Sequence, residues 1–190
     1  MPISRHFLEG PLEEDSNVVN LTCVLDKLPS EYVIESIIVD YVLYLIAKRG
    51  FDGLQLFMDK RGRTEQYTML RYIMRTLVDR AAEFERNYLP RFENRQALLL
   101  SMPERAKLDF MSTLEDIWSD GLANWGRFLA YITFVGAYCT SVLDAGMVYT
   151  IKLLVEAAVH DLNLRVGKWL LDNGGWRGCY LALEAMNRKE

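Results

Sequence analysis

The sequence predicts an all-α protein with one main domain. Apolar residues recur every three to four positions through most of the chain, as on one face of a helix. No segment alternates apolar and polar residues like a half-buried strand, and no internal repeat is visible. A chain of 190 residues is most simply one domain with a substantial core. We place the helical domain at residues 30–190, after a partly irregular extension at residues 1–29.

The first long helix is predicted to begin at Ser30. Serine is a good N-cap after Pro29, and Glu31 suits the first turn of a helix. Gly50 is the expected C-cap, because it follows two basic residues that favour the C-terminal end of the helix dipole. The apolar face of this helix is wide and comprises Val33, Ile34, Ile37, Ile38, Tyr41, Val42, Leu45 and Ile46.

A short connection at residues 51–63 leads to a second helix, predicted from Thr64 to Leu89. Pro90 ends this helix, because the residue before a proline avoids the helical conformation. A short helix is expected at residues 91–100. The sequence Ser101-Met102-Pro103-Glu104 then has the form of a capping box, which predicts another helix continuing to about Ser119.

Four helices are predicted in the remainder of the chain. Asp120-Gly121, Asp144-Ala145-Gly146 and Asn173-Gly174-Gly175 are strong turn signals and separate most of them. Asn124 is the expected N-cap of the first of the four. The predicted helices run from Asn124 to about Leu143, from Met147 to about Asn163, from Arg165 to Asp172, and from Trp176 to Asn187.

The most apolar stretch, Phe128–Leu143, is too short to cross a membrane comfortably and contains several small or polar residues. We therefore expect it to be a core helix. No secretory signal begins the sequence. The sequence ends in Asn187-Arg188-Lys189-Glu190, without a hydrophobic tail anchor. Either the protein lacks such an anchor or the sequence stops before it.

Composition argues against several classes of function. The formal net charge is −4, which disfavours nucleic acid as the main partner. The three cysteines, Cys23, Cys139 and Cys179, lie far apart without metal-ligand spacing, and we interpret them as free thiols in a reducing compartment. The two histidines, His6 and His160, have no Cys, Asp or Glu at ligand spacing. We find no catalytic motif, and expect neither an enzyme nor a cofactor or metal.

The segment around residues 119–128 has a different character. Asn124, Trp125, Gly126 and Arg127 open a helix that is otherwise apolar. The N-terminus of a helix offers free N–H donors, and a glycine there lets another backbone approach closely. A charge on the first turn of an apolar helix is costly unless it is paired. For Arg127, two pairings remain open: an internal ion pair, or a carboxylate supplied by a partner.

Three motifs in the chain resemble those of a known family. Asp-Gly-x-x-Asn-Trp-Gly-Arg at residues 120–127 resembles the first homology motif of the Bcl-2 family, with the spacing of its myeloid-leukaemia (Mcl) type. Trp169–Trp176 resembles the second motif. Val39-Asp40-Tyr41, with Tyr44, Leu45 and Lys48-Arg49-Gly50-Phe51, resembles the fourth. These motifs follow the family's order, and the resemblance covers about residues 30–187.

The third motif departs from the family pattern. Ile73, Leu77 and Phe84 fit the family's apolar ladder at positions i, i+4 and i+11. However, Ala81-Ala82 replaces the family's Gly-Asp, and Arg80 occupies the ladder position i+7. Without that aspartate, we expect this helix to be a poor ligand for another copy but an adequate wall of a groove.

The resemblance implies a helical bundle with a central apolar hairpin wrapped by amphipathic helices. In prosurvival members, a surface groove receives the amphipathic homology-three helix of a proapoptotic relative. By this resemblance, Arg127 would pair with the ligand's aspartate, Asn124 would hydrogen-bond the same acidic stretch, and Gly126 would admit a small residue. The groove would be completed by Trp125, Phe84, Tyr88, Phe92, Leu114, Ile117, Phe134, Trp176 and Tyr180. Of these, Leu114 and Phe134 are equally compatible with the core.

The resemblance therefore implies a prosurvival inhibitor of apoptosis whose partners are homology-three helices of the Bim, Bak or Bax type. We expect a cytoplasmic protein recruited to the mitochondrial outer membrane, indirectly or through a missing tail. The short connection, absent tail and altered third motif favour a compact, virus-encoded homologue. Three alternatives remain: a proapoptotic member that permeabilises membranes, a restricted binder whose groove is occluded by homodimerisation, and a purely structural bundle.

Overall fold

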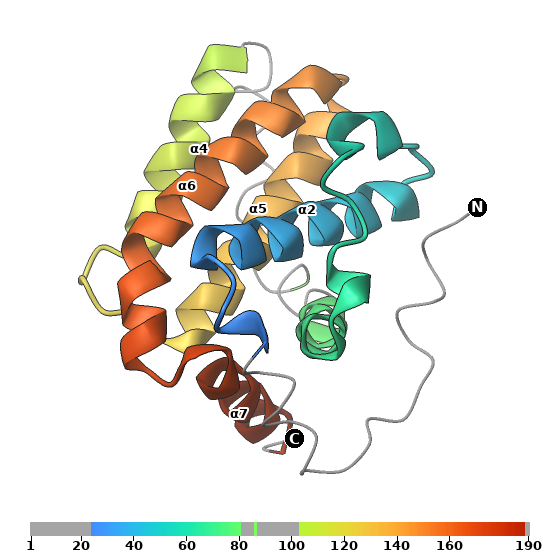
Figure 1. Cartoon of the computed structure of the whole chain (residues 1–190). Helices are drawn as coiled ribbons and strands as arrows, with labels where there is room; N and C mark the ends of the chain where they lie inside the picture. Colours follow the sequence, from blue (N-terminus) through green and yellow to red (C-terminus); the bar gives the residue numbers. More distant parts are fainter. Residues whose placement is uncertain (1–23, 81–85, 87–102, 189–190) are drawn as a thin grey trace.

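A computed structural model describes residues 24–80, 86 and 103–188, and these ranges contain helices and turns but no strand (Figure 1). The prediction of an all-α fold is confirmed. One helix, for which residues 68–80 are described, lies between the 3₁₀ turns and α4 in the chain. The α-helices whose bounds are described at both ends are α2 (Ser30–Lys48), α4 (Pro103–Ile117), α5 (Trp125–Asp144), α6 (Val148–Asp172) and α7 (Gly175–Asn187).

Helix α2 crosses α5 and packs against both α5 and α6 (Figure 1). Of its 19 residues 12 are buried, so the wide apolar face predicted from the sequence extends almost around the helix. A helix that is apolar on nearly every side is a core helix. The contact with α5 depends on Gly136, where a Cβ atom would lie 2.5 Å from side-chain atoms of both Tyr41 and Leu45.

Helices α5 and α6 form the apolar hairpin that the resemblance implied. Helix α5 spans 20 residues and, alone among the described helices, has the length and composition of a membrane span. It is thus longer than the apolar stretch recognised in the sequence. Because 72% of its apolar window is buried inside the protein, its packing is that of a core helix.

One contact between α2 and α6 overturns two predictions. The sequence predicted Ser30 as an N-cap and a break between helices near Asn163. Instead, the hydroxyl of Ser30 donates to Oδ1 of Asn163 at 2.7 Å. The N-cap of α2 is Pro29, which provides no side-chain cap. Helix α6 continues without a break from Val148 to Asp172, so Asn163 lies inside the helix, where its side chain accepts this hydrogen bond instead of ending the helix.

The helix predicted to begin at Thr64 begins later. Thr64–Gln66 forms a 3₁₀ turn, η3, after an earlier 3₁₀ turn, η2 (Leu54–Phe57), and the α-helix starts at residue 68. Thr64 is fully buried and hydrogen-bonds the side chain of Asp40, so it is held by a tertiary contact rather than by the helix. The short helix predicted at residues 91–100 lies outside the described residues.

Candidate functional site

The N-terminus of α5 is capped as the sequence predicted. The backbone of Asn124 is extended, with φ −155° and ψ 165°, and its side-chain Oδ1 accepts a hydrogen bond from the backbone N–H of Arg127 at 2.9 Å. This contact satisfies one of the free donors of the first turn. Gly121 has a φ of 70°, which lets the preceding loop turn back towards the start of α5.

That turn gives Arg127 an internal partner. Its Nη1 and Nη2 atoms donate to the two carboxylate oxygens of Asp120, and Nη1 also donates to the carbonyl oxygen of Leu122 at 2.7 Å. Of the two pairings that the sequence left open, the isolated chain has the internal ion pair. The hydrogen bonds from Arg127 hold the pKa of Asp120 well below its ordinary value of 3.8.

The ion pair lies nearer the surface than expected. The side chain of Arg127 is 28% exposed and that of Asp120 is 46% exposed. In the isolated chain the loop therefore supplies a counter-charge for the guanidinium and leaves it partly hydrated, so the first turn of α5 carries no unpaired buried charge.

Gly126 lies beside this ion pair and is exposed. A Cβ atom placed on it would meet, among the described residues beyond its own helix backbone, only the capping oxygen of Asn124 at 3.2 Å. Packing inside the described part of the protein therefore does not require a glycine here. Its outer face leaves room for an approaching backbone.

A cluster of aromatic rings joins the first and second homology motifs. The ring of Trp125 lies 4.8 Å from that of Trp169 and 5.8 Å from that of Phe128, between centroids. Phe128 in turn contacts Trp176 at 6.2 Å. Such tilted and edge-on arrangements stabilise packed aromatic pairs beyond their buried area. The cluster therefore fixes the start of α5 against the end of α6 and the start of α7.

Several predicted groove residues belong to the core in this state. Leu114 is fully buried, and Phe134 is buried and stacks on Phe110 at 5.8 Å between ring centroids. Trp176 is also buried rather than exposed at the end of a groove. Ile117 and Tyr180 are partly buried. The remaining predicted groove residues, Phe84, Tyr88 and Phe92, lie outside the described residues, as do Ala81 and Ala82.

The helix at residues 68–80 is fastened to α7, which the sequence did not predict. The hydroxyl of Tyr72 donates to the carboxylate of Glu184, and its ring lies 5.0 Å from that of Tyr180. Further along the helix, Nη2 of Arg80 donates to the carbonyl oxygen of Met186 at 2.9 Å. These partners are more than 100 positions apart in the chain, so no local pattern could indicate them.

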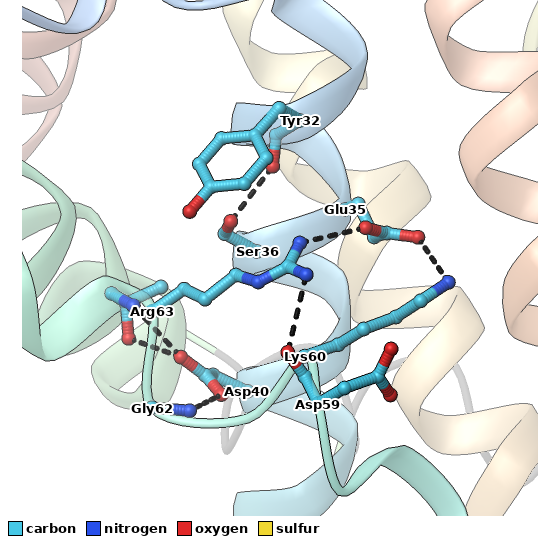
Figure 2. Close-up of polar contacts among 9 residues, drawn as sticks. Tyr32, Glu35, Ser36, Asp40, Asp59, Lys60, Gly62 and Arg63 are labelled. Atoms are coloured by element: carbon cyan, nitrogen blue, oxygen red, sulfur yellow. Dashed lines mark hydrogen bonds and ion pairs between the residues drawn. The ribbon is translucent and has the colours of Figure 1, made fainter.

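Asp40, in the motif that resembles the fourth homology motif, anchors the segment leading into that helix (Figure 2). Its carboxylate accepts hydrogen bonds from the backbone N–H of Gly62 at 2.6 Å, the backbone N–H of Thr64 at 2.9 Å and the Thr64 hydroxyl at 2.7 Å. Asp40 is only 3% exposed. Burial raises its pKa above the ordinary 3.8, although these hydrogen bonds and the charge of Arg63 oppose the rise.

Glu35, five residues before Asp40 on α2, completes this contact. It accepts hydrogen bonds from Nζ of Lys60 at 2.7 Å and from Nη1 of Arg63 at 2.8 Å (Figure 2). The guanidinium of Arg63 also lies over the ring of Tyr32, 4.7 Å from its centroid. We refer to Asp40, Glu35 and their donors as the α2 clamp. Its geometry is that of a structural fastening rather than of a catalytic site.

The described residues offer no cluster of three or more His, Cys, Asp or Glu side chains able to hold a metal ion. Cys139 and Cys179 are both buried and free. Burial raises the pKa of Cys139 to about 12, so its thiol remains protonated at neutral pH. Both cysteines therefore behave as core residues.

Comparison with known proteins identifies the family. The model of the Bcl-2 family of apoptosis regulator proteins matches residues 63–176, more than half of the chain. Bcl-2-like protein 1 from Sus scrofa is 30% identical over 104 residues, which is 55% of this chain and 44% of that protein. Apoptosis regulator Bcl-2 from Gallus gallus is 31% identical over 94 residues, which is 50% of this chain and 40% of that protein. The matches thus span less than half of either relative.

The matched region includes η3, α4, the capped start of α5, the whole α5–α6 hairpin and Trp176. The two motifs that the aromatic cluster joins therefore lie inside it. The family match and the helical bundle lead to one conclusion: the chain belongs to the Bcl-2 family of apoptosis regulators.

Proposed function

We propose that the chain is a prosurvival regulator that holds the amphipathic homology-three helix of a proapoptotic relative in a hydrophobic groove. The observation that carries this proposal is the start of α5. A partly exposed arginine, an exposed asparagine and a glycine with an open face lie together there, on a helix anchored by the aromatic cluster. The names of the relatives, which describe regulators of apoptosis, support it.

The mechanism is recognition of a helix in a groove. Apolar side chains of the ligand helix, spaced i, i+4, i+7 and i+11, enter the groove, while its aspartate binds Arg127. Asn124 contacts the same acidic stretch, and Gly126 admits a small ligand residue. A ligand that is disordered when free loses roughly 2–5 kcal/mol of its gross binding energy to ordering.

The rest of the groove is proposed from the residues carried over by resemblance. Trp125, Phe84, Tyr88, Phe92, Ile117, Trp176 and Tyr180 belong to this set. Leu114 and Phe134, which are buried in the isolated chain, would form its floor once the neighbouring side chains move apart to admit a ligand.

The state of the chain's own third-motif helix favours a receiving role over an exporting one. Its ladder residues Ile73 and Leu77 are fully buried, and Arg80 is bonded to the end of α7. A protein that offered this helix to others would first have to break these contacts. The observation supports the prosurvival proposal over the permeabilising alternative, in which α5 would also have to leave the core.

Calorimetric titration with homology-three peptides of the Bim, Bak and Bax types tests the proposal. We expect at least one to bind, and Arg127→Ala to weaken it about 10-fold or more, since hydrogen bonds to charged groups contribute about 1.5–3 kcal/mol. Arg49→Ala is the matched control, because Arg49 forms a surface ion pair with Asp144 at the opposite end of α5. It should leave peptide affinity unchanged.

Two results would contradict the proposal: binding of no peptide across the panel, or equal affinity for the wild type and Arg127→Ala. A liposome assay addresses the permeabilising alternative, because release of an enclosed dye in the presence of these peptides would exclude a prosurvival role. Sedimentation with and without peptide addresses the occluded binder, since a dimer that dissociates on peptide binding would identify a groove occluded by homodimerisation.

We propose that the protein acts in the cytoplasm and at the mitochondrial outer membrane.

A further inference from the structure

We infer that Asp120 is an internal competitor for Arg127, so that a partner's carboxylate binds by replacing the Asp120 carboxylate on the guanidinium. The inference rests on the proposed function, and it adds a residue that sets the selectivity of the same site. No carboxylate of the chain other than that of Asp120 is bonded to Arg127 among the described residues.

The geometry of Asp120 resembles that of a bound ligand. Both of its carboxylate oxygens face the two terminal nitrogens of Arg127, which is the bidentate arrangement that guanidinium and carboxylate groups favour. A ligand aspartate would seek the same arrangement. In the isolated chain this position is therefore already taken by a group of the same chemistry.

One contact still links the loop to Arg127 when the Asp120 carboxylate leaves the guanidinium. Oδ1 of Asp120 accepts the backbone N–H of Leu122 at 2.9 Å, and the carbonyl of Leu122 accepts Nη1 of Arg127 at 2.7 Å. The second contact does not involve Asp120, so it can hold the arginine in place during the exchange. The Asp120 side chain is 46% exposed and can return to water, and exposed ion pairs of this kind contribute little to stability.

Exchange is favoured over sharing by simple electrostatics. Two carboxylates on one guanidinium leave a net negative charge, and like charges at close range repel. A ligand helix covering the site would also remove water and strengthen that repulsion. Binding of a ligand carboxylate should therefore release Asp120.

Asp120 consequently reduces the site's preference for acidic ligands. The binding free energy that a ligand aspartate gains at Arg127 is only the difference between its own ion pair with the arginine and the Asp120 ion pair that it replaces. A ligand with a neutral residue leaves the internal pair intact, so Arg127 is not buried without a partner, a situation that would be costly. Removing the internal carboxylate should widen the difference in affinity between the two kinds of ligand.

Calorimetry on Asp120→Asn tests this inference with the tightest-binding homology-three peptide and its Asp→Asn counterpart. We expect the variant to bind the acidic peptide about 2- to 5-fold more tightly than the wild type does, the range set by an exposed ion pair. It should bind the neutral peptide no more tightly. Asp116→Asn, which removes an exposed carboxylate four residues earlier on α4, is the control and should change neither affinity.

Carbon NMR of the Asp120 carboxyl group distinguishes exchange from sharing. In the free protein the group should titrate well below 3.8. In the complex with the acidic peptide the Asp120 carboxyl group should titrate near 3.8, whereas in the complex with the neutral peptide its pKa should remain well below 3.8. Two results would overturn the inference: a pKa of Asp120 that stays well below 3.8 in the acidic complex, or an affinity of Asp120→Asn for the acidic peptide that is equal to or weaker than that of the wild type.

The failure of the proposed function has a different signature. If neither the wild type nor Asp120→Asn binds any peptide, the groove proposal fails and the exchange fails with it. If the wild type binds peptides and Asp120→Asn binds them equally, only the exchange fails.

Discussion

Replacing Asp40 with alanine removes the acceptor at the centre of the α2 clamp. In the native protein this carboxylate accepts three hydrogen bonds, two from Thr64 and one from Gly62, and Asp40 is only 3% exposed (Figure 2). The substitution leaves all three donors without their acceptor. It should therefore loosen the segment that leads into the helix at residues 68–80.

The expected loss of stability follows from the three hydrogen-bond donors that lose their acceptor. A donor left unsatisfied on burial costs about 1–3 kcal/mol, but alanine also removes the cost of burying a carboxylate, and water can reach Gly62 at the edge of the contact. We expect Asp40→Ala to lower the free energy of unfolding by about 2–4 kcal/mol. Thr64→Val, which removes only the hydroxyl donor, should cost about 1 kcal/mol.

Urea denaturation followed by circular dichroism measures both losses. The double variant should be less destabilised than the sum of the single variants by about 1 kcal/mol, because the hydrogen bond from the Thr64 hydroxyl can be lost only once. Asp144→Ala, at an exposed ion pair, is the control and should change stability by less than about 0.5 kcal/mol. A cost below about 1 kcal/mol for Asp40→Ala, or complete additivity with Thr64→Val, would refute the reasoning.

The pH dependence of Asp40→Asn provides a separate check. Burial raises the pKa of Asp40 in the folded state above its ordinary 3.8, so the folded protein binds this proton more tightly than the unfolded chain does. The contribution of Asp40 is therefore fully present below 3.8 and declines as pH rises through the raised pKa. The wild type should gain stability relative to Asp40→Asn as pH falls from neutral towards 3.8, and the opposite trend would contradict this assignment.

Further substitutions test other parts of the fold and site. Gly126→Ala should change stability by less than about 0.5 kcal/mol yet weaken peptide binding, whereas Gly136→Ala should destabilise the protein by about 1–3 kcal/mol, because its new Cβ would overlap side chains of α2. If urea denaturation gave equal losses of stability for Gly126→Ala and Gly136→Ala, the outer face of Gly126 would not be open. Asn124→Ala removes the side-chain cap of α5 and should cost about 1 kcal/mol in the same assay, and no loss would mean that the cap is dispensable. Burial and the neighbouring Glu184 carboxylate raise the pKa of Tyr72 far above 10.0, so its contribution is present below that pH and is lost as pH rises through the raised value. Thermal unfolding should therefore show the advantage of the wild type over Tyr72→Phe shrinking above pH 10, and a constant difference would contradict this.

The sequence by itself determined the features that depend on near neighbours. Helical periodicity indicated α2, α4, α5 and α7, and the asparagine before Trp125 indicated the cap of α5, because a cap bonds a backbone N–H only three positions away. The family also followed from short motifs. Each of these signals comes from residues close together in the sequence, so it can be recognised without knowledge of the tertiary structure.

Only the tertiary structure decided the rest, because those features depend on residues brought together by folding. Ser30 resembled a cap until Asn163 proved to be its partner, 133 positions away. Leu114 and Phe134 were compatible with core or groove, since an apolar side chain is the same in both, and packing placed them in the core of the isolated chain. Arg127 required a counter-charge in either case. Seven positions separate it from Asp120, and only the turn at Gly121 folds the loop back so that the chain supplies that charge itself.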